Sequence, residues 1–178
     1  MRADARRNYE QLVEQAKLAF AEFGVDASLD EIARRAGVAS GTLYRHFPTR
    51  LDLVEVVLAG QIAALADRGR GLLTAEDGFD ALATWLRAAT THALTYRGLA
   101  AAALNSAPAA GWHAELFEVG AALLARARQS GAVVADADAA DVVTMVGAIA
   151  WAAQDSPDSA DRLLTLFMNG LRHDSGQH

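Results

Sequence analysis

The side chains of this sequence that could do chemistry point to binding rather than to catalysis. The chain has no cysteine, which excludes disulfides, thiolate metal ligands and cysteine nucleophiles. Its five histidines include no pair spaced four residues apart, so we expect no metal site. We find no nucleophile elbow, no phosphate-binding glycine loop and no convincing pair of carboxylates. The sequence therefore predicts a protein that is not an enzyme and that uses neither a cofactor nor a metal.

Charge is distributed unevenly along the chain. The formal net charge is −6, which argues against a general binder of polyanions. Residues 1–50 contain eight basic and seven acidic side chains, whereas residues 51–178 contain eight and fifteen. An anion-binding face is therefore expected only within the first 50 residues.

Composition predicts an all-α protein. The 178 residues include 41 alanines and three prolines, and alanine is the strongest helix former whereas proline is tolerated mainly at helix ends. With 52% hydrophobic residues, the chain can build one or two small domains with a real core. Its uncharged stretches are shorter than the roughly 20 residues of a membrane span, and its start lacks the apolar core of a signal peptide. We expect about nine helices, no membrane partner and a cytoplasmic location.

The first 50 residues carry the pattern of a helix-turn-helix. Apolar residues recur every three or four positions from Tyr9 to Phe23, which predicts a first helix that ends at Gly24. Ser28 and Glu31 have the spacing of a capping box at the start of a second helix.

Gly37 then interrupts the apolar pattern, and a third helix is expected from Ser40 to Phe47. Pro48 stops this helix, and Thr49 can cap a fourth helix that extends to about Leu73.

This motif closely resembles the DNA-binding domain of the TetR family of bacterial transcriptional regulators. The resemblance covers about 50 residues without a gap, and it rests on the run Ser28-Leu29-Asp30-Glu31-Ile32-Ala33-Arg34-Arg35-Ala36-Gly37-Val38 and on Gly41-Thr42-Leu43-Tyr44-Arg45-His46-Phe47-Pro48-Thr49-Arg50. A looser likeness to a C-terminal domain of the family extends from Leu123 to Arg172. We therefore expect a DNA-binding domain at residues 1–50, with its motif at 28–47, and a ligand-binding and dimerisation domain at residues 51–178.

The resemblance implies a homodimeric transcriptional regulator that a small-molecule effector releases from a palindromic operator in double-stranded DNA. A ligand-recruited activator of the same fold is the alternative. An enzyme that uses the C-terminal cavity, with His92 or His113 as its base, and an adaptor that has lost DNA binding were also weighed.

The resemblance assigns the DNA contacts to the third helix and to the residue that starts the fourth. Thr42 is the candidate for reading a base, because its hydroxyl and methyl groups suit base edges. Tyr44 would contact phosphate unless it is a half-buried core residue. The basic side chains near the start form either a solvated tail or an arm that contacts phosphates: Arg2, Arg6 and Arg7. The expected DNA-binding residues are Ser40, Gly41, Thr42, Tyr44, Arg45, His46 and Arg50.

Two further sets of residues are expected in the rest of the chain. One face of a helix that ends near Tyr96, together with the start of the next helix after a loop at residues 105–112, could line an effector pocket or simply form core: Trp85, Ala89, His92, Tyr96 and Trp112. The last two helices are apolar over broad faces and could pair with their copies in a second subunit, or close the core of a monomer: Val142, Val146, Ile149, Leu163 and Phe167.

Overall fold

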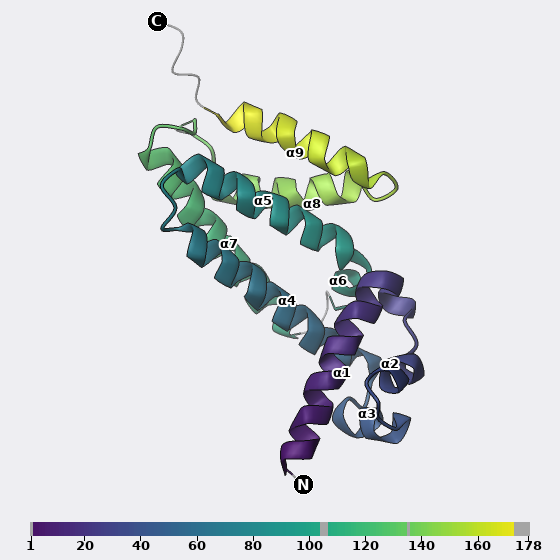
Figure 1. Ribbon diagram of the computed structural model, residues 1–178. Coiled ribbons are helices and arrows are strands. Elements are labelled where there is room, and N and C mark those ends of the chain that lie inside the picture. Colours follow the sequence, from purple (N-terminus) through teal and green to yellow (C-terminus); the bar gives the residue numbers. More distant parts are fainter. Residues whose placement is uncertain (1, 104–106, 135, 173–178) are drawn as a thin grey trace, which may run out of the picture. The chain divides into compact units, whose positions relative to one another are not determined.

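The computed structural model describes residues 2–103, 107–134 and 136–172 (Figure 1). Over these residues the protein is all-α, as the sequence predicts, and no strand is present beyond one isolated bridge between Val133 and Arg172. None of the described helices combines the length and the apolar character that a membrane crossing requires. The elements are α1 (Arg2–Phe23), the 3-10 helix η1 (Gly24–Asp26), α2 (Leu29–Arg35), α3 (Ser40–His46), α4 (Arg50–Leu72), α5 (Gly78–Thr95), α6 (Arg97–Ala103), α7 (Ala107–Gln129), α8 (Ala139–Ala152) and α9 (Pro157–Leu171).

The chain forms two compact units. One contains residues 1–61 and 95–109, and the other contains residues 62–94 and 110–178. The expected boundary at residue 50 falls where α4 begins, but α4 is one continuous helix whose first three turns belong to the first unit. Packing therefore divides the chain within a helix rather than at the loop that precedes it.

The first unit is built on a small core under α1, α2 and α3. Leu12 and Phe20 of α1 are fully buried, as are Ile32 of α2 and Leu43 of α3. Their spacing puts each of them on the inner side of its helix. Gly37 has φ +70° in the turn between α2 and α3, a conformation that residues other than glycine rarely adopt. The helix-turn-helix expected from the sequence is thus present.

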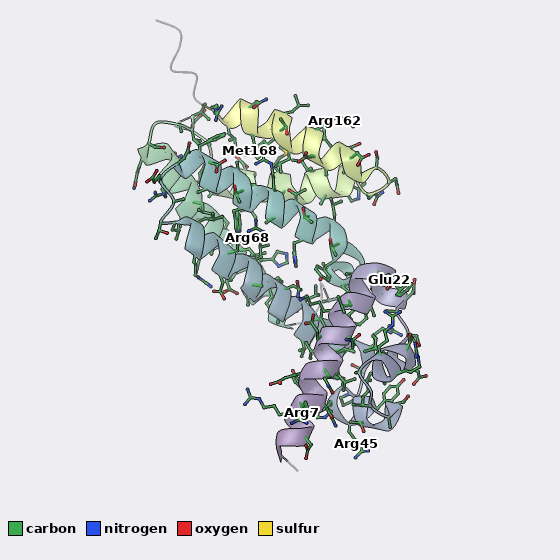
Figure 2. The ribbon with its side chains drawn as sticks, viewed as in Figure 1. Arg7, Glu22, Arg45, Arg68, Arg162 and Met168 are labelled. Atoms are coloured by element: carbon green, nitrogen blue, oxygen red, sulfur yellow. The ribbon has the colours of Figure 1, made fainter. Side chains whose placement is uncertain are left out.

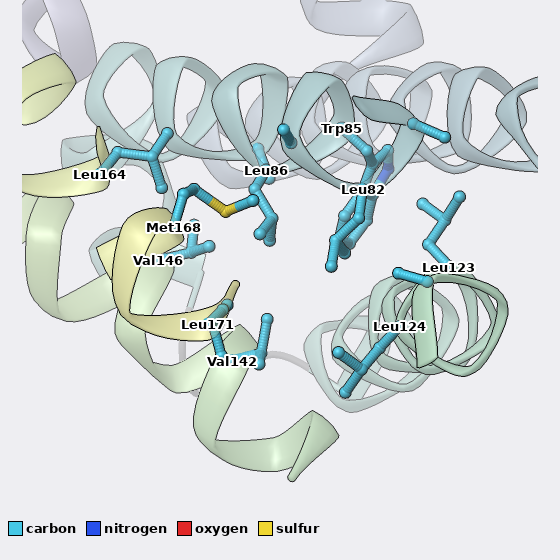
Figure 3. Packing of buried hydrophobic residues seen from close by; sticks show 14 of the residues in the cluster. Leu82, Trp85, Leu86, Leu123, Leu124, Val142, Val146, Leu164, Met168 and Leu171 are labelled. Atoms are coloured by element: carbon cyan, nitrogen blue, oxygen red, sulfur yellow. The ribbon is translucent and has the colours of Figure 1, made fainter. Parts of the chain in front are cut away.

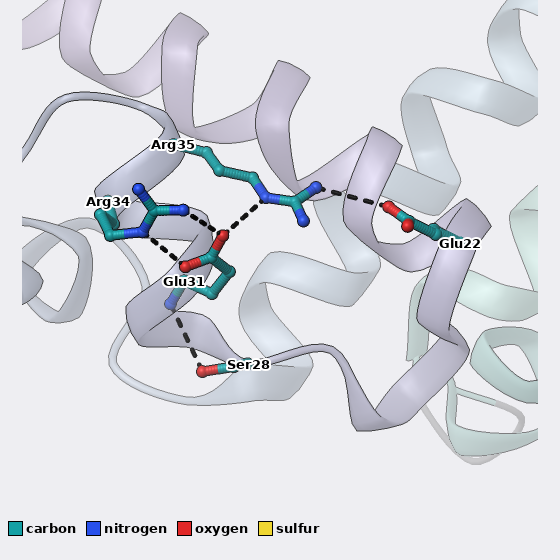
Figure 4. Close-up of polar contacts among 5 residues, drawn as sticks. All are labelled: Glu22, Ser28, Glu31, Arg34 and Arg35. Atoms are coloured by element: carbon teal, nitrogen blue, oxygen red, sulfur yellow. Dashed lines mark hydrogen bonds and ion pairs between the residues drawn. The ribbon is translucent and has the colours of Figure 1, made fainter.

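Local side-chain bonds start two of these helices. The Ser28 hydroxyl accepts from the Glu31 amide at 3.3 Å and caps α2. The Glu31 carboxylate does not return this bond, because it binds the guanidinium groups of Arg34 and Arg35 instead (Figure 4). At the start of α4, the amide of Asp52 donates to the Thr49 hydroxyl at 3.2 Å, and the Asp52 carboxylate accepts from the amide and the hydroxyl of Thr49.

The connection between α5 and α7 differs from the expected loop. A short helix, α6, follows α5, and α7 already begins at Ala107, so Pro108 and Gly111 lie inside its first turns. Proline is tolerated there because the first amides of a helix have no partner within the helix. The loop predicted over residues 107–112 is therefore wrong, whereas Asn105 and Ser106 lie outside the described residues.

The second unit packs α5, α7, α8, α9 and the end of α4 around one hydrophobic cluster (Figure 3). Trp85 of α5 lies at its centre, and its indole nitrogen donates to the backbone carbonyl of Leu65 at 3.1 Å. Two glycines leave room for this ring: a Cβ on Gly69 would collide with Trp85 and with Val119, and a Cβ on Gly120 would lie 3.1 Å from the ring. Trp85 thus joins α4, α5 and α7 by close packing and one hydrogen bond.

Caps and a bracket fix the last two helices. The Asp138 carboxylate accepts from the Ala140 amide at 2.7 Å and starts α8. The amide of Val134 donates to the carbonyl of Leu171 at the end of α9, and the Arg172 guanidinium lies 4.6 Å from the centre of the Phe79 ring. The end of α9 is therefore tied to the start of α5.

Candidate nucleic-acid interface

The short helix α3 separates apolar from polar side chains. Leu43 and Phe47 are buried against the core, whereas Gly41, Tyr44 and Arg45 are exposed. Tyr44 keeps 46% of its surface accessible, so it is not the half-buried core residue that the sequence left open. The outer side of α3 thus presents a phenol, a guanidinium and a bare stretch of backbone.

Three further residues of α3 are half-buried: Ser40, Thr42 and His46. The His46 ring meets the Tyr9 ring of α1 edge to face, with ring centres 5.8 Å apart. Tyr9 also stacks on Phe47, with ring centres 5.3 Å apart. The sequence predicted Tyr9 only as part of an apolar stripe, and it did not indicate that this ring supports the end of α3.

Gly41 has no internal reason to be glycine. A Cβ built at this position meets no atom within 4 Å, and its backbone does not adopt a left-handed conformation. The space that a side chain would fill is open to solvent. This is the geometry expected where a backbone comes close to another molecule.

Arg45 folds back onto its own helix. Its Nε donates to the Gly41 carbonyl at 3.0 Å, and the rest of the side chain reaches outward from α3 (Figure 2). Because the remaining guanidinium nitrogens lie at the surface, they can bind an anion or a base edge without breaking this bond.

Arg50 is engaged within the protein. Its Nη1 donates to the carbonyls of Val25 and Ala27, at 2.8 and 2.6 Å. These bonds tie the start of α4 to the segment between α1 and α2. The sequence indicated a basic group at a helix start, but it gave no signal for partners more than 20 residues away. Arg50 is thus first a fastening within the unit, and only its remaining nitrogens face outward.

The basic residues at the start of α1 are exposed. Arg6 pairs with Glu10 at 2.9 Å, while Arg7 extends outward from α1 (Figure 2).

The five residues expected to line an effector pocket are not brought together. Trp85 and Ala89 are buried in the second unit, Trp112 is half-buried on α7, and Tyr96 belongs to the first unit. Burial lowers the pKa of His92, which favours its neutral form. Burial also raises the pKa of the Tyr96 hydroxyl, and the negative charge of Glu14 adds to this effect.

A different hollow lies in the second unit. It has a volume of about 310 Å³ and contains none of the five expected residues; it is lined by Arg87, Thr90, Thr91, Leu94, Ala160, Asp161 and Leu164. These residues come from α5 and α9. The sequence did not indicate this groove because the pattern of α5 alone does not show where α9 crosses it.

The residues expected at a subunit interface divide between core and surface. Val142, Val146 and Ile149 of α8 are buried inside the chain's own core, so a second subunit cannot reach them. Phe167 is half-buried against the same core, and Leu163 is 36% exposed. The exposed apolar side chains of α8 and α9 also include Met145, Trp151 and Leu166, with Trp151 at 70% and Leu166 at 69%.

Comparisons with known proteins agree with the fold and with the motif. Residues 12–57 match the model of bacterial regulatory proteins of the tetR family, and residues 77–173, more than half of the chain, match the C-terminal domain of SbtR-like transcriptional regulators. The chain belongs to the TetR family. A TetR-family DNA-binding regulator is thus the class of protein to which α3 and its neighbours must be referred.

Solved structures of TetR-family regulators resemble the whole chain. The regulator SCO0520 from Streptomyces coelicolor is 32% identical, with a TM-score of 0.77 over 93% of this chain and 99% of that one. A TetR regulatory protein from Mycobacterium vanbaalenii is 34% identical, with a TM-score of 0.74 over 97% and 99%.

Among curated relatives, the similarity is confined to one part. The HTH-type regulator TtgW of Pseudomonas putida is 40% identical over 60 residues, which are 33% of this chain and 45% of TtgW. The match thus spans less than half of that relative.

Proposed function

We propose that this TetR-family protein is a repressor that binds a palindromic operator as a homodimer and leaves it when a small molecule binds. The observation that carries the DNA-binding part is the outer side of α3. There an exposed phenol and guanidinium stand beside a glycine that no internal contact requires. A protein that only needed α3 for its core would gain helix stability from alanine at Gly41.

In the proposed complex, α3 lies in the major groove, which is wide enough to admit an α-helix. Thr42 contacts a base edge, and Tyr44 and His46 contact phosphates. Ser40 and Gly41 bring the start of α3 close to the DNA backbone. Arg45 reaches a guanine or a phosphate with the nitrogens that its bond to Gly41 leaves available.

Arg50 has two roles in this proposal. Its bonds to the carbonyls of Val25 and Ala27 hold the start of α4, and its charge attracts phosphate. A loss of DNA affinity in an Arg50 variant would therefore combine a structural and an electrostatic effect.

The proposed dimer uses the solvent side of α8 and α9. Large apolar side chains are costly to leave in water, and Trp151 and Leu166 are the most exposed of them in the described residues. A two-fold axis through this surface would make a self-complementary contact and would place two copies of α3 for half-sites one turn of DNA apart.

The proposed effector binds within the second unit. The groove between α5 and α9 offers an apolar floor with the hydroxyls of Thr90 and Thr91 and the charges of Arg87 and Asp161 at its edges. Binding that changes operator affinity by about 5- to 150-fold corresponds to a coupling of roughly 1–3 kcal/mol. Because the family acts on the chromosome of bacteria, we place the protein in the cytoplasm.

Selection of a binding site from a pool of random duplex DNA tests this function. The selected duplex would then be titrated by fluorescence anisotropy at several salt concentrations, with a scrambled duplex as control. A two-fold symmetric sequence with a steep salt dependence is expected. If the folded protein selects no sequence with or without candidate effectors, the proposal fails. If an effector strengthens binding rather than weakening it, the protein is an activator or a co-repressed regulator instead.

A further inference from the structure

A second surface lies beside α3 and belongs to α1. The two helices enclose a groove of about 430 Å³ in the first unit. Asp4, Ala5 and Asn8 of α1 form one wall, and three residues of the proposed DNA-reading helix form the other: Thr42, Arg45 and His46.

The lining of this groove is rich in hydrogen-bond donors. Asn8 contributes an amide group, Thr42 a hydroxyl, Arg45 a guanidinium and His46 an imidazole. Asp4 is the one carboxylate among these six lining residues. A group with several acceptor oxygens and a negative charge fits such a surface better than a cation or an apolar group does.

The wall of the groove is held in place from behind. The Tyr9 ring contacts His46 edge to face and stacks on Phe47, so the imidazole is fixed relative to α1. Asn8 is adjacent to Tyr9 in the sequence and is half-buried. The donors of Asn8 and His46 therefore belong to one supported surface rather than to two independent side chains.

We propose that the groove between α1 and α3 binds a phosphate of the DNA backbone, and that Asn8 donates a hydrogen bond to it. The inference rests on the proposed function, since α3 must lie in the major groove. The sugar–phosphate strand that borders the major groove then passes beside α3, on the side where Thr42, Arg45 and His46 face α1. The DNA contact surface thus includes the first helix of the chain, in addition to the helix-turn-helix.

The test compares matched charge changes on α1. Gln11 is an exposed amide on the same helix, one turn from Asn8, and it does not line the groove. The variants N8K and Q11K each add one positive charge, and N8D and Q11E each add one negative charge. Circular dichroism and thermal unfolding of all four variants establish that they fold. The probes are the selected operator duplex and a scrambled duplex, titrated between about 50 and 300 mM potassium chloride.

We expect the changes at Asn8 to exceed those at Gln11. N8K adds a phosphate contact, so the slope of log affinity against log salt concentration becomes steeper by about 0.9, whereas Q11K changes it little. N8D loses the hydrogen bond and places a carboxylate beside the phosphate, so affinity for both duplexes falls by roughly tenfold or more. Q11E is expected to lower affinity by a much smaller factor.

Equal effects at the two positions would overturn the inference, because they would reflect net charge alone. Binding of inorganic phosphate or a short peptide in the groove, with DNA affinity unaffected by N8D, would also overturn it. The proposed function itself fails in a different way, since the unmodified protein would then bind the selected and the scrambled duplex alike or neither of them.

Discussion

Gly41 provides the sharpest test at the scale of a single residue. Alanine at this position meets no atom within 4 Å, so G41A should preserve the fold and stabilise α3 by up to about 1 kcal/mol. The added methyl group would keep the backbone from the DNA, and operator affinity should fall by roughly tenfold or more. Thermal unfolding and anisotropy titration of the same preparation measure both effects. A variant that gains stability and keeps full affinity would show that the α3 backbone does not approach DNA.

Glu31 predicts how the first unit responds to acid. Hydrogen bonds from Arg34 and then from Arg35 lower its pKa from an ordinary value of 4.5 to about 2. A carboxylate with a depressed pKa stabilises the folded state above its ordinary pKa, and this contribution is lost as the pH falls from about 4.5 towards 2. The variant E31Q lacks that contribution at every pH. Its melting temperature should therefore decline less than that of the unmodified protein between about pH 5 and pH 3.

The control for this prediction is D30N, which removes an exposed carboxylate from the same turn of α2. If D30N flattens the acid response as much as E31Q does, the pairing of Glu31 with the two arginines has no particular importance.

Residue-scale features could be predicted from sequence where their partners are close in the chain. Ser28, Thr49 and Asp138 cap helices through residues two or three positions away, and all three caps were expected or offered as alternatives. The bonds of Arg50 to Val25 and Ala27 were not expected, because they depend on how α4 meets the turn before α2. The DNA contacts assigned to α3 remain predictions.

At the scale of elements, α1 supports the end of α3 through a single aromatic contact group. Replacing Tyr9 by leucine removes the ring that contacts His46 and Phe47, while Y9F keeps it. If Tyr9 positions the His46 imidazole for DNA, Y9L and H46A should not be additive, and the coupling energy in operator binding should reach about 0.5–3 kcal/mol. Y9F should bind the operator as the unmodified protein does. Anisotropy titrations of the double-mutant cycle measure this coupling.

A parallel cycle with Y44A serves as the control, because Tyr44 lies on the exposed side of α3 and has no recorded ring contact with Tyr9. Its energies should add within about 0.5 kcal/mol. Equal coupling in both cycles would mean that Y9L disturbs α3 as a whole.

The contact of α4 with α5 and α7 gives a second prediction at this scale. A Cβ at Gly69 would collide with Trp85 and Val119, whereas a Cβ at Gly60 of the same helix meets nothing within 4 Å. G69A should therefore destabilise the protein by about 1–3 kcal/mol, and G60A should stabilise it by up to about 1 kcal/mol. Chemical denaturation measures both. Similar stabilities of the two variants would show that the end of α4 is not held closely against α5 and α7.

The elements show where a sequence pattern is sufficient and where it is not. The helix-turn-helix was predictable because glycine, proline and capping residues mark its ends. The start of α7 was not, because Pro108 indicates a break but is also accommodated in a first turn. The apolar face of α8 was ambiguous for another reason: it is apolar on most sides, so periodicity does not distinguish the side that forms the core from the side that meets solvent.

At the scale of the whole molecule, the exposed side of α9 should decide the oligomeric state. Leu166 is 69% exposed, so L166E should leave the subunit folded while it places a charge in the proposed interface. Sedimentation velocity should then detect a monomer, and operator affinity should fall because two half-sites are no longer bound together. The control is F117E, which changes an exposed apolar residue of α7. If L166E remains dimeric, or if F117E dissociates the dimer as readily, the subunits meet elsewhere.

The three tryptophans occupy three different environments, which gives the molecule a built-in optical probe. Trp151 is exposed on α8 and Trp112 is half-buried on α7, whereas the indole of Trp85 is enclosed and hydrogen-bonded to the carbonyl of Leu65 in α4. A variant that keeps Trp85 and has phenylalanine at the other two positions would report by its emission on a single contact. Since that contact joins α4 to α5, its spectrum would follow any effector-driven movement of α4 without a label and without DNA.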